Sequence, residues 1–308
     1  TGIDTPPLAP GDEHWEAWWN FHFASYLTVV EKYAAAVHAC KPSALVCANW
    51  LDSIRFPVSG RGGTDWLSGD AAPFWSFDDS RCEVRWLSNR SKSWDLMSWP
   101  HLGIWNFHLK SRDMLCQEAA SVTAAGGRYI FCELSGGIRS SQLPSWRLRR
   151  LAEIGDFVRE RQPFCQDNQG HPEVAVLRSL SGPKQGMLES QPAAARPAVT
   201  ALLECHYGVD LVDEWALLPR LGEFKVVVVP EADRLEASTV AALKRYVAAG
   251  GRLLVTGAGT IERFGAEFFG IARMEVETVS PEAGARWSFL AVKDAEPLYF
   301  LPDGDGVF

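Results

Sequence analysis

Three acidic residues, Asp70, Asp95 and Glu133, are expected at the strand ends of a parallel fold; Asp95 and Glu133 lie in segments whose composition predicts strands, and Asp70 closes the segment that begins at Asp65. In parallel α/β barrels the loops that follow the strands build the active site, so we expect these carboxyl groups at one edge of a sheet. Hydrolysis of a glycosidic bond needs two carboxyl groups, about 5–5.5 Å apart for retention and about 6.5–9.5 Å apart for inversion. The three acids are therefore candidate catalytic residues for this chemistry.

Each acid also has a structural interpretation. Asp70 can cap a loop as an Asx turn. Asp95 lies in an apolar segment, where a carboxylate must be paired or functional because burying it alone is costly, and Arg85 and Arg90 are candidate partners. Glu133 can cap the glycine-containing loop that follows it. The sequence leaves both interpretations open for all three acids.

Aromatic side chains cluster near these acids. Sugar rings present apolar CH faces that pack on flat aromatic surfaces, while sugar hydroxyl groups need fixed polar partners. A single tryptophan or histidine is more often a core or surface residue, so the clustering carries the prediction. The candidate substrate-binding residues are Trp66, Trp94, Trp99, Trp105 and His101.

No metal or cofactor site is predicted. The sequence has no HxH or HExxH spacing. Its glycine-rich stretch at 60–63 lacks the GxGxxG pattern followed by a helix that a nucleotide-binding loop needs. The seven cysteines are odd in number and widely spaced, which favours reduced thiols rather than a disulfide framework. Reduced thiols favour a cytoplasmic location.

Composition limits the classes of molecule that the protein is expected to bind. The 308 residues, 47% hydrophobic and 22% charged, suffice for two domains with buried cores. The net charge of −8 argues against a nucleic-acid surface and permits a neutral sugar substrate. Without a run of about 18 apolar residues, no membrane span is predicted.

Helical and strand patterns alternate along residues 1–165, which is typical of a parallel α/β fold. Eleven of the 13 tryptophans lie before residue 150, and the polar stretch 162–172 reads as a linker. The predicted helices are Trp15–His38, Lys110–Ala124 and Trp146–Arg161, and the predicted strands are Ala44–Ala48, Ser93–Trp99 and Arg128–Glu133.

The alternation is clearer over 172–308 and predicts a doubly wound, flavodoxin-like or Rossmann-like domain. The turn after the central strand holds Pro230-Glu231-Ala232-Asp233, without the Cys or Ser that amidotransferase chemistry needs. The predicted strands are Val174–Leu177, Val209–Val212, Phe224–Val229 and Arg252–Thr256, and the predicted helices are Ala194–Tyr207 and Ser238–Ala249.

These motifs resemble a known arrangement. The second unit, with Val226-Val227-Val228-Val229-Pro230 and the segment from Gly250 to Gly257, resembles the trimerisation domain of family 42 β-galactosidases, which is related to class I glutamine amidotransferases. The first unit, with Asn49-Trp50, the segments 65–70 and 94–99, and Gly126-Gly127-Arg128-Tyr129, resembles the last barrel strands of those enzymes and of related α-L-fucosidases. The resemblance implies the C-terminal portion of a (β/α)8 TIM-type barrel over 1–165, followed by a flavodoxin-like, doubly wound domain over 172–308.

The resemblance also implies a function: a glycoside hydrolase of the β-galactosidase or α-L-fucosidase type, with a carbohydrate substrate and assembly into a homo-oligomer such as a trimer. Two departures matter. No Asn-Glu dipeptide occurs, so the family's acid/base is expected in a missing N-terminal half, and the chain is expected to be a fragment that is inactive alone. Where the family's nucleophilic Glu would fall, this sequence has Ser98.

Two alternatives stay open. Ser98 in place of a Glu favours a catalytically silent carbohydrate-binding or scaffold protein that kept the fold. A nucleotide- or flavin-binding role for the second unit is disfavoured by the lack of a phosphate-binding loop.

Overall fold

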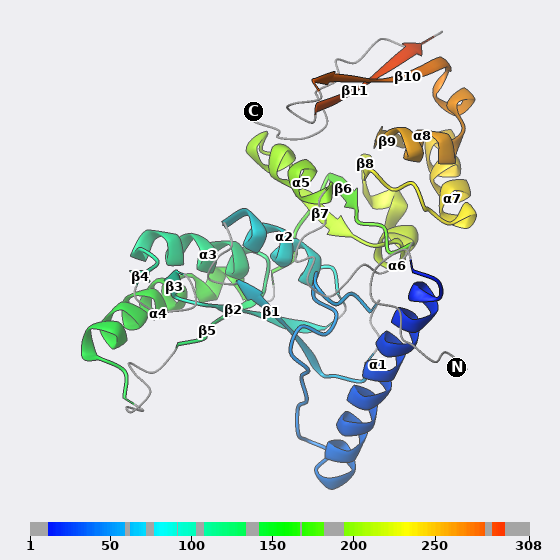
Figure 1. The fold of residues 1–308 in the computed structure, drawn as a ribbon. Helices are drawn as coiled ribbons and strands as arrows, with labels where there is room; N and C mark the ends of the chain where they lie inside the picture. Colours follow the sequence, from blue (N-terminus) through cyan, green and yellow to red (C-terminus); the bar gives the residue numbers. More distant parts are fainter. Residues whose placement is uncertain are drawn as a thin grey trace. The chain divides into compact units, whose positions relative to one another are not determined.

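The computed structural model describes residues 12–58, 62–71, 77–90, 92–102, 108–133, 142–166, 168–181, 194–280 and 285–292. The chain divides into two compact units, Thr1–His171 with Pro183–Pro192 and Pro172–Gly182 with Ala193–Phe308. Each unit contains a parallel sheet with helices packed on it (Figure 1).

The sheet of the first unit has three parallel strands in the order β1-β2-β5. Helices separate these strands along the chain, as right-handed parallel connections require. The strands are β1 (Trp66–Ala71), β2 (Ser93–Ser98) and β5 (Arg128–Phe131), a small hairpin joins β3 (His101–Leu102) to β4 (His108–Leu109), and the helices are α1 (Trp15–Cys40), α2 (Phe77–Leu87), α3 (Arg112–Ala124) and α4 (Ser145–Cys165).

The strand predicted at Ala44–Ala48 is wrong, because this segment has no regular ladder. It nevertheless runs beside β1: Asp65 N donates to Val46 O at 2.8 Å, and Trp50 N donates to Ser68 O at 3.2 Å. The N–H of Val46 donates instead to the Asp65 carboxylate at 2.6 Å. Because a side chain takes a donor that a ladder would use, the segment lies along the sheet without becoming a strand.

The sequence pattern did not predict β1 or α2. Gly69 lies inside β1. A Cβ atom there would stand 2.7 Å from Glu83 Oε1 and 2.9 Å from Leu87 Cδ1, so glycine allows α2 to approach the strand closely. Helix α2 buries charged side chains such as Asp79 as well as apolar ones, which hides its amphipathic pattern.

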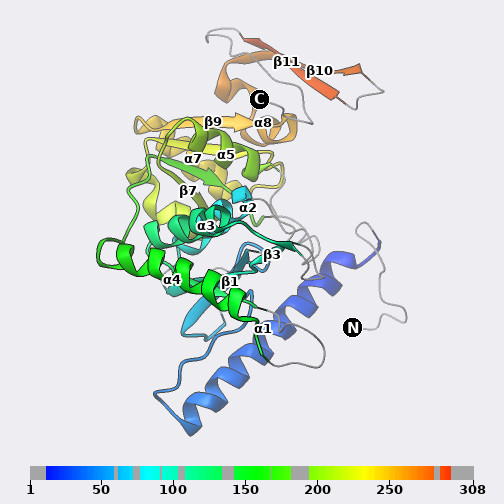
Figure 2. The same cartoon turned by 90° about the vertical axis from the view of Figure 1, so that its left-hand side faces the viewer.

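The two faces of this sheet differ. Side chains alternate between faces along a strand, so residues in register share a face. One face, with Leu96 and Tyr129, packs against α3, and α3 and α4 lie side by side (Figure 2). We call the opposite face the inner face; it carries Ser68, Asp70, Asp95, Met97 and Ile130, which the strand register places together.

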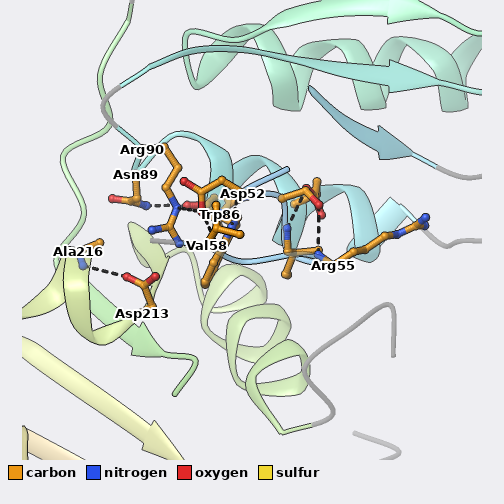
Figure 3. A network of polar contacts seen from close by, with 12 residues as sticks. Asp52, Arg55, Val58, Trp86, Asn89, Arg90, Asp213 and Ala216 are labelled. Atoms are coloured by element: carbon orange, nitrogen blue, oxygen red, sulfur yellow. Dashed lines mark hydrogen bonds and ion pairs between the residues drawn. The ribbon is translucent and has the colours of Figure 1, made fainter. Parts of the chain in front are cut away.

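A buried polar network supports the loop after the segment 44–50. Asp52, 1% exposed, accepts a hydrogen bond from Val58 N at 3.2 Å and lies 3.7 Å from Arg90 Nε. The indole of Trp86 donates to Asp52 O at 2.9 Å, and the Arg90 guanidinium lies over its ring, 4.0 Å from the centroid (Figure 3). The loop is therefore tied to α2 and the turn after it.

The sheet of the second unit has four parallel strands in the order β7-β6-β8-β9. Three of the predicted strands match their observed bounds, while the fourth, predicted from Phe224, begins at Val226. The core includes Leu177, Val212, Val229 and Phe264. The strands are β6 (Val174–Leu177), β7 (Val209–Val212), β8 (Val226–Pro230), β9 (Arg252–Thr256) and the hairpin β10 (Ile271–Ser280) and β11 (Ala285–Val292); the helices are α5 (Ala195–Glu204), α6 (Glu214–Leu217), α7 (Ala237–Ala248) and α8 (Ala258–Phe264), with 3-10 turns at Leu218–Glu223 and Ala266–Phe269.

Candidate active site

Asp70 lies on the inner face, one residue before the carboxyl end of β1. Its side chain is almost completely buried, with 3% of the residue exposed. Oδ2 accepts a hydrogen bond from the indole Nε1 of Trp50, whereas the buried Oδ1 has no hydrogen-bond partner in the part of the chain that the structure describes. A buried carboxyl oxygen without a partner is costly in a purely structural residue.

The surroundings of Asp70 favour its protonated form. Burial raises the pKa of the Asp70 carboxyl, and the negative charge of Asp95 raises it further. The hydrogen bond from Trp50 and the positive charge of Arg55 act in the opposite direction without cancelling the rise in pKa. A raised pKa favours the protonated form that a general acid needs.

Asp95 lies on the same face, further from the carboxyl ends of the strands than Asp70. The register pairs Asp70 with Met97, two residues beyond Asp95. With a rise of about 3.3 Å per residue and strands about 4.8 Å apart, the Cα atoms of the two acids are about 8 Å apart. That spacing is compatible with the carboxyl separations of glycosidases.

The partners of Asp95 are neutral groups. Ser68 Oγ donates to one carboxyl oxygen at 2.6 Å, and Trp66 Nε1 donates to the other at 3.0 Å. Burial raises the pKa of Asp95, and these two hydrogen bonds lower it in part. The arginine partners suggested by the sequence are not the donors observed here, since Arg90 pairs with Asp52.

Glu133 follows β5 and forms a buried ion pair. Its Oε1 lies 2.6 Å from Arg147 Nη1 of α4, and both side chains are 8% exposed. Both acids act on the neighbouring Cys132. Burial raises the pKa of its thiol, and the charges of Asp70 and Glu133 raise it further. Glu133 is therefore close to the Asp70 group but already has a cationic partner.

Two aromatic candidates follow the end of β2. The rings of Trp99 and His101 meet edge to face, with centroids 5.5 Å apart. Trp99 Nε1 and both ring nitrogens of His101 are buried and have no hydrogen-bond partner among the described residues. Burial lowers the pKa of His101, and Arg147 and Lys110 lower it further, so this ring is neutral.

The remaining aromatic candidates differ in position. Trp66 is committed to Asp95 through its indole N–H. Trp94 is 5% exposed and lies on the helix-covered face, where a Cβ atom on Gly127 would come within 2.3 Å of its ring. The geometry therefore places Trp94 away from a ligand on the inner face. Trp105 lies outside the described residues.

Ser98 lies on the face of the sheet opposite Asp70 and Asp95. It belongs to the helix-covered face, is fully buried, and donates to Glu118 Oε2 of α3 at 2.6 Å. The same carboxylate accepts from Lys110 Nζ at 2.5 Å and from the Tyr129 hydroxyl at 3.2 Å. The absence of a Glu at Ser98 therefore says nothing about the inner face.

Sequence reasoning missed Trp50 and Arg55 as parts of the site. Trp50 ends the segment 44–50 and Arg55 lies on the loop that follows it, and the Arg55 guanidinium stands 4.7 Å from the centroid of the Trp50 ring. Trp50 appeared only within a family-like dipeptide, and no local pattern connects either residue with Asp70. Their proximity arises only when this loop meets the end of β1.

No group of three or more His, Cys, Asp or Glu side chains is arranged to hold a metal ion in the described part of the chain. Within those ranges, none of the helices has the length and apolar character needed to cross a bilayer.

No family model and no curated protein matches the sequence. An α-L-fucosidase, isoenzyme 2, from Paenibacillus thiaminolyticus superposes with a TM-score of 0.64 at 18% identity, over 92% of this chain and 45% of that one. An exo-β-1,4-mannosidase from Opitutaceae bacterium strain TAV5 gives 0.56 at 13% identity, over 87% and 57%. An apo exo-carrageenase, GH42, from Bacteroides ovatus gives 0.52 at 9% identity, over 92% and 49%.

This chain has a glycoside hydrolase fold. It spans about half the length of each of these structures, 45%, 57% and 49%. At such identities the likeness concerns the fold alone and does not place the chain in family 42.

Proposed function

We propose that the chain is part of a glycoside hydrolase whose active site lies on the inner face, at the carboxyl ends of β1, β2 and β5. One observation carries the proposal. Asp70 is a buried carboxyl group with one oxygen held by Trp50 and the other without a partner among the described residues, in the position where barrel enzymes place their catalytic groups.

In this proposal Asp70 is the general acid. Its proton passes to the glycosidic oxygen as the bond from that oxygen to the anomeric carbon breaks, and the bonding electron pair stays on the oxygen of the leaving group. The developing oxocarbenium ion needs a second carboxylate, which either attacks the anomeric carbon or activates water.

Asp95 and Glu133 are the candidates for that second carboxylate in this chain. Asp95 shares the inner face with Asp70, whereas Glu133 would first have to loosen its ion pair with Arg147. A carboxylate from another part of a larger enzyme is the third source. Trp66, Trp99 and His101 are the proposed sugar-binding residues.

The substrate class proposed is an O-glycoside of the β-galactoside or α-L-fucoside type. The mannosidase and exo-carrageenase neighbours share only the fold, so their substrates belong in a test panel rather than in the proposal. No cofactor is proposed.

The test is turnover of nitrophenyl glycosides by the complete enzyme that contains this chain, with Asp70→Asn, Asp95→Asn and Glu133→Gln beside the wild type. We expect Asp70→Asn to lower kcat/KM by about 10³-fold. The second carboxylate is the one whose loss is equally severe. Full activity in Asp70→Asn, or binding of sugars without any turnover by the wild type, contradicts the proposal.

For the second unit we propose a flavodoxin-like module that mediates assembly of a homo-oligomer. The strand order β7-β6-β8-β9 is that of a doubly wound sheet, which supports this proposal. The turn after β8 carries Glu231 and Asp233 and no nucleophilic Cys or Ser, so the module has no amidotransferase role.

A further inference from the structure

The backbone at Trp50 adopts a conformation that is unusual for a large side chain. Its φ angle is 65°, in the left-handed region that favours glycine, and Asp52 follows with a φ of 58°. Residues held in such conformations persist only when the surrounding contacts over-determine them, and they concentrate at functional sites. The unusual backbone at Trp50 and Asp52 therefore points to contacts of this loop that have a functional role.

One contact of Trp50 reaches the acid. Its Nε1–H donates to Asp70 Oδ2, so this oxygen acts as an acceptor and cannot also carry a proton toward the indole. Because the carbonyl oxygen of a protonated carboxyl group is the better acceptor, the indole favours placing the proton of Asp70 on Oδ1, the oxygen that has no other partner in the described parts of the chain. The indole thus selects which oxygen is the donor.

Arg55 acts on both partners. Its guanidinium stacks over the Trp50 ring at 4.7 Å, which fixes the plane of the indole. Its positive charge also acts on Asp70, in the direction opposite to that of burial. Residues 50–55 therefore supply both the hydrogen-bond donor, Trp50, and the positive charge, Arg55, that act on the Asp70 carboxyl group.

The charged and titratable groups around Asp70 come from several elements. Asp95 of β2 and Cys132 after β5 lie on the inner face and interact with it electrostatically, and Arg55 comes from the loop. Burial lowers the pKa of Arg55, whereas Glu83 and Asp79 of α2 act in the opposite direction and favour its charged form. Trp50 is the group that bonds to Asp70 directly.

We propose that Trp50 is a positioning residue that occupies Oδ2 of Asp70 and leaves Oδ1 as the oxygen that donates the catalytic proton, with Arg55 holding the indole in place. The inference rests on the proposed function, because it assigns the donor atom of the proposed general acid. The hydrogen bond from Trp50 to Asp70 and its effect on the titration of Asp70 can, however, be measured without any turnover.

The experiment follows the Asp70 carboxyl by ¹³C NMR in the chain labelled at aspartate carboxyl carbons. Asp70→Asn identifies the resonance by its loss. Trp50→Phe keeps a ring under Arg55 but removes the N–H donor, so the Asp70 titration should move to higher pH. Arg55→Gln removes the favourable charge and should move it in the same direction, which keeps the test valid if one variant does not fold.

Trp66→Phe is the matched control. It removes the same kind of donor from Asp95, so the Asp95 titration should move and the Asp70 titration should change much less. An Asp70 titration that stays at its wild-type position in both Trp50→Phe and Arg55→Gln overturns the inference.

Kinetics of the complete enzyme provide the second readout. For Trp50→Phe we expect kcat to fall by about 10- to 100-fold with little change in KM, and the limb of the pH profile that reports the acid to move to higher pH. A loss confined to KM contradicts a positioning role. If the titration moves as expected but no wild-type glycoside turns over, the hydrogen bond is established and the proposed hydrolase function fails.

Discussion

At the scale of single residues, Asp70 combines burial with incomplete pairing. Its one hydrogen bond comes from Trp50, and its other carboxyl oxygen has no partner in the described region. Stability alone would favour a neutral side chain in this position, because a buried charge is costly unless it is fully paired. Active sites often keep such residues at the expense of stability.

We therefore predict that Asp70→Asn raises the thermal stability while it abolishes activity. The folded-state pKa of Asp70 is raised above its unfolded value, so its contribution to stability is fully present below the unfolded pKa of about 3.9 and is lost as pH rises through the folded pKa. The asparagine variant lacks this loss. Its advantage in Tm should be absent near pH 3.5 and should grow to a few degrees at neutral pH.

Thermal unfolding between pH 3.5 and 7.5 measures this difference. Asp113→Asn, at a carboxylate whose side chain is 85% exposed, is the control and should show little change in Tm with pH relative to wild type. A difference in Tm between Asp70→Asn and wild type that is the same at every pH contradicts the prediction.

At the scale of elements, a single carboxylate joins α3 to two strands. Glu118, 3% exposed, accepts from Ser98 of β2, Tyr129 of β5 and Lys110, which is itself 2% exposed. The strands that carry Asp95 and lead to Glu133 are thereby fixed against the same helix. Precise placement of site residues depends on such supporting contacts.

We predict that Glu118→Ala lowers the free energy of unfolding by about 3–5 kcal/mol, because it leaves the Lys110 ammonium buried without its counter-charge. Urea unfolding measures the change. Adding Lys110→Met should restore part of the loss, since methionine leaves no ammonium group buried without a counter-charge. Asp156→Asn, which breaks an exposed pair with Arg159, is the control and should cost less than about 1 kcal/mol. A cost for Glu118→Ala as small as that of the control contradicts the prediction.

At the scale of the whole molecule, the second unit leaves part of its sheet uncovered. Strand β9 lies at an edge of the sheet, and its side chains alternate between packed and exposed positions. Leu253 and Val255 pack on the core, whereas Leu254 is 42% exposed. An edge strand with an exposed apolar face can associate with another chain.

We predict that the protein forms a homo-oligomer and that Leu254→Lys lowers its mass in light scattering coupled to size exclusion. The charge blocks apolar contact at the edge of β9 without touching the core. Lys225→Glu, at an exposed side chain elsewhere in the unit, is the comparison and should leave the mass unchanged. A wild-type mass of one chain contradicts the assembly proposal.

Several elements could be predicted from local sequence alone. Apolar runs such as Val174–Leu177 and Val209–Val212 are strands with the predicted bounds, because a fully buried strand needs a continuous apolar run. The predicted helix Trp15–His38 is observed as α1, Trp15–Cys40. Local pattern failed at Ala44–Ala48 and at β1, where a side-chain acceptor and a close helix contact decide the backbone structure.

Some features of the candidate site could likewise be predicted from local sequence, and others could not. The sequence by itself placed Asp95 within a predicted strand and Glu133 at the end of another, because strand periodicity and chain order are local properties; it did not predict β1, the strand that carries Asp70. Only the tertiary structure decided which side chains share the inner face and which are already paired. Register places Asp70 and Asp95 together, turns Ser98 toward Glu118, and brings Trp50 to Asp70 across 20 residues of chain. Such contacts depend on how distant segments pack, and no local pattern in the sequence encodes them.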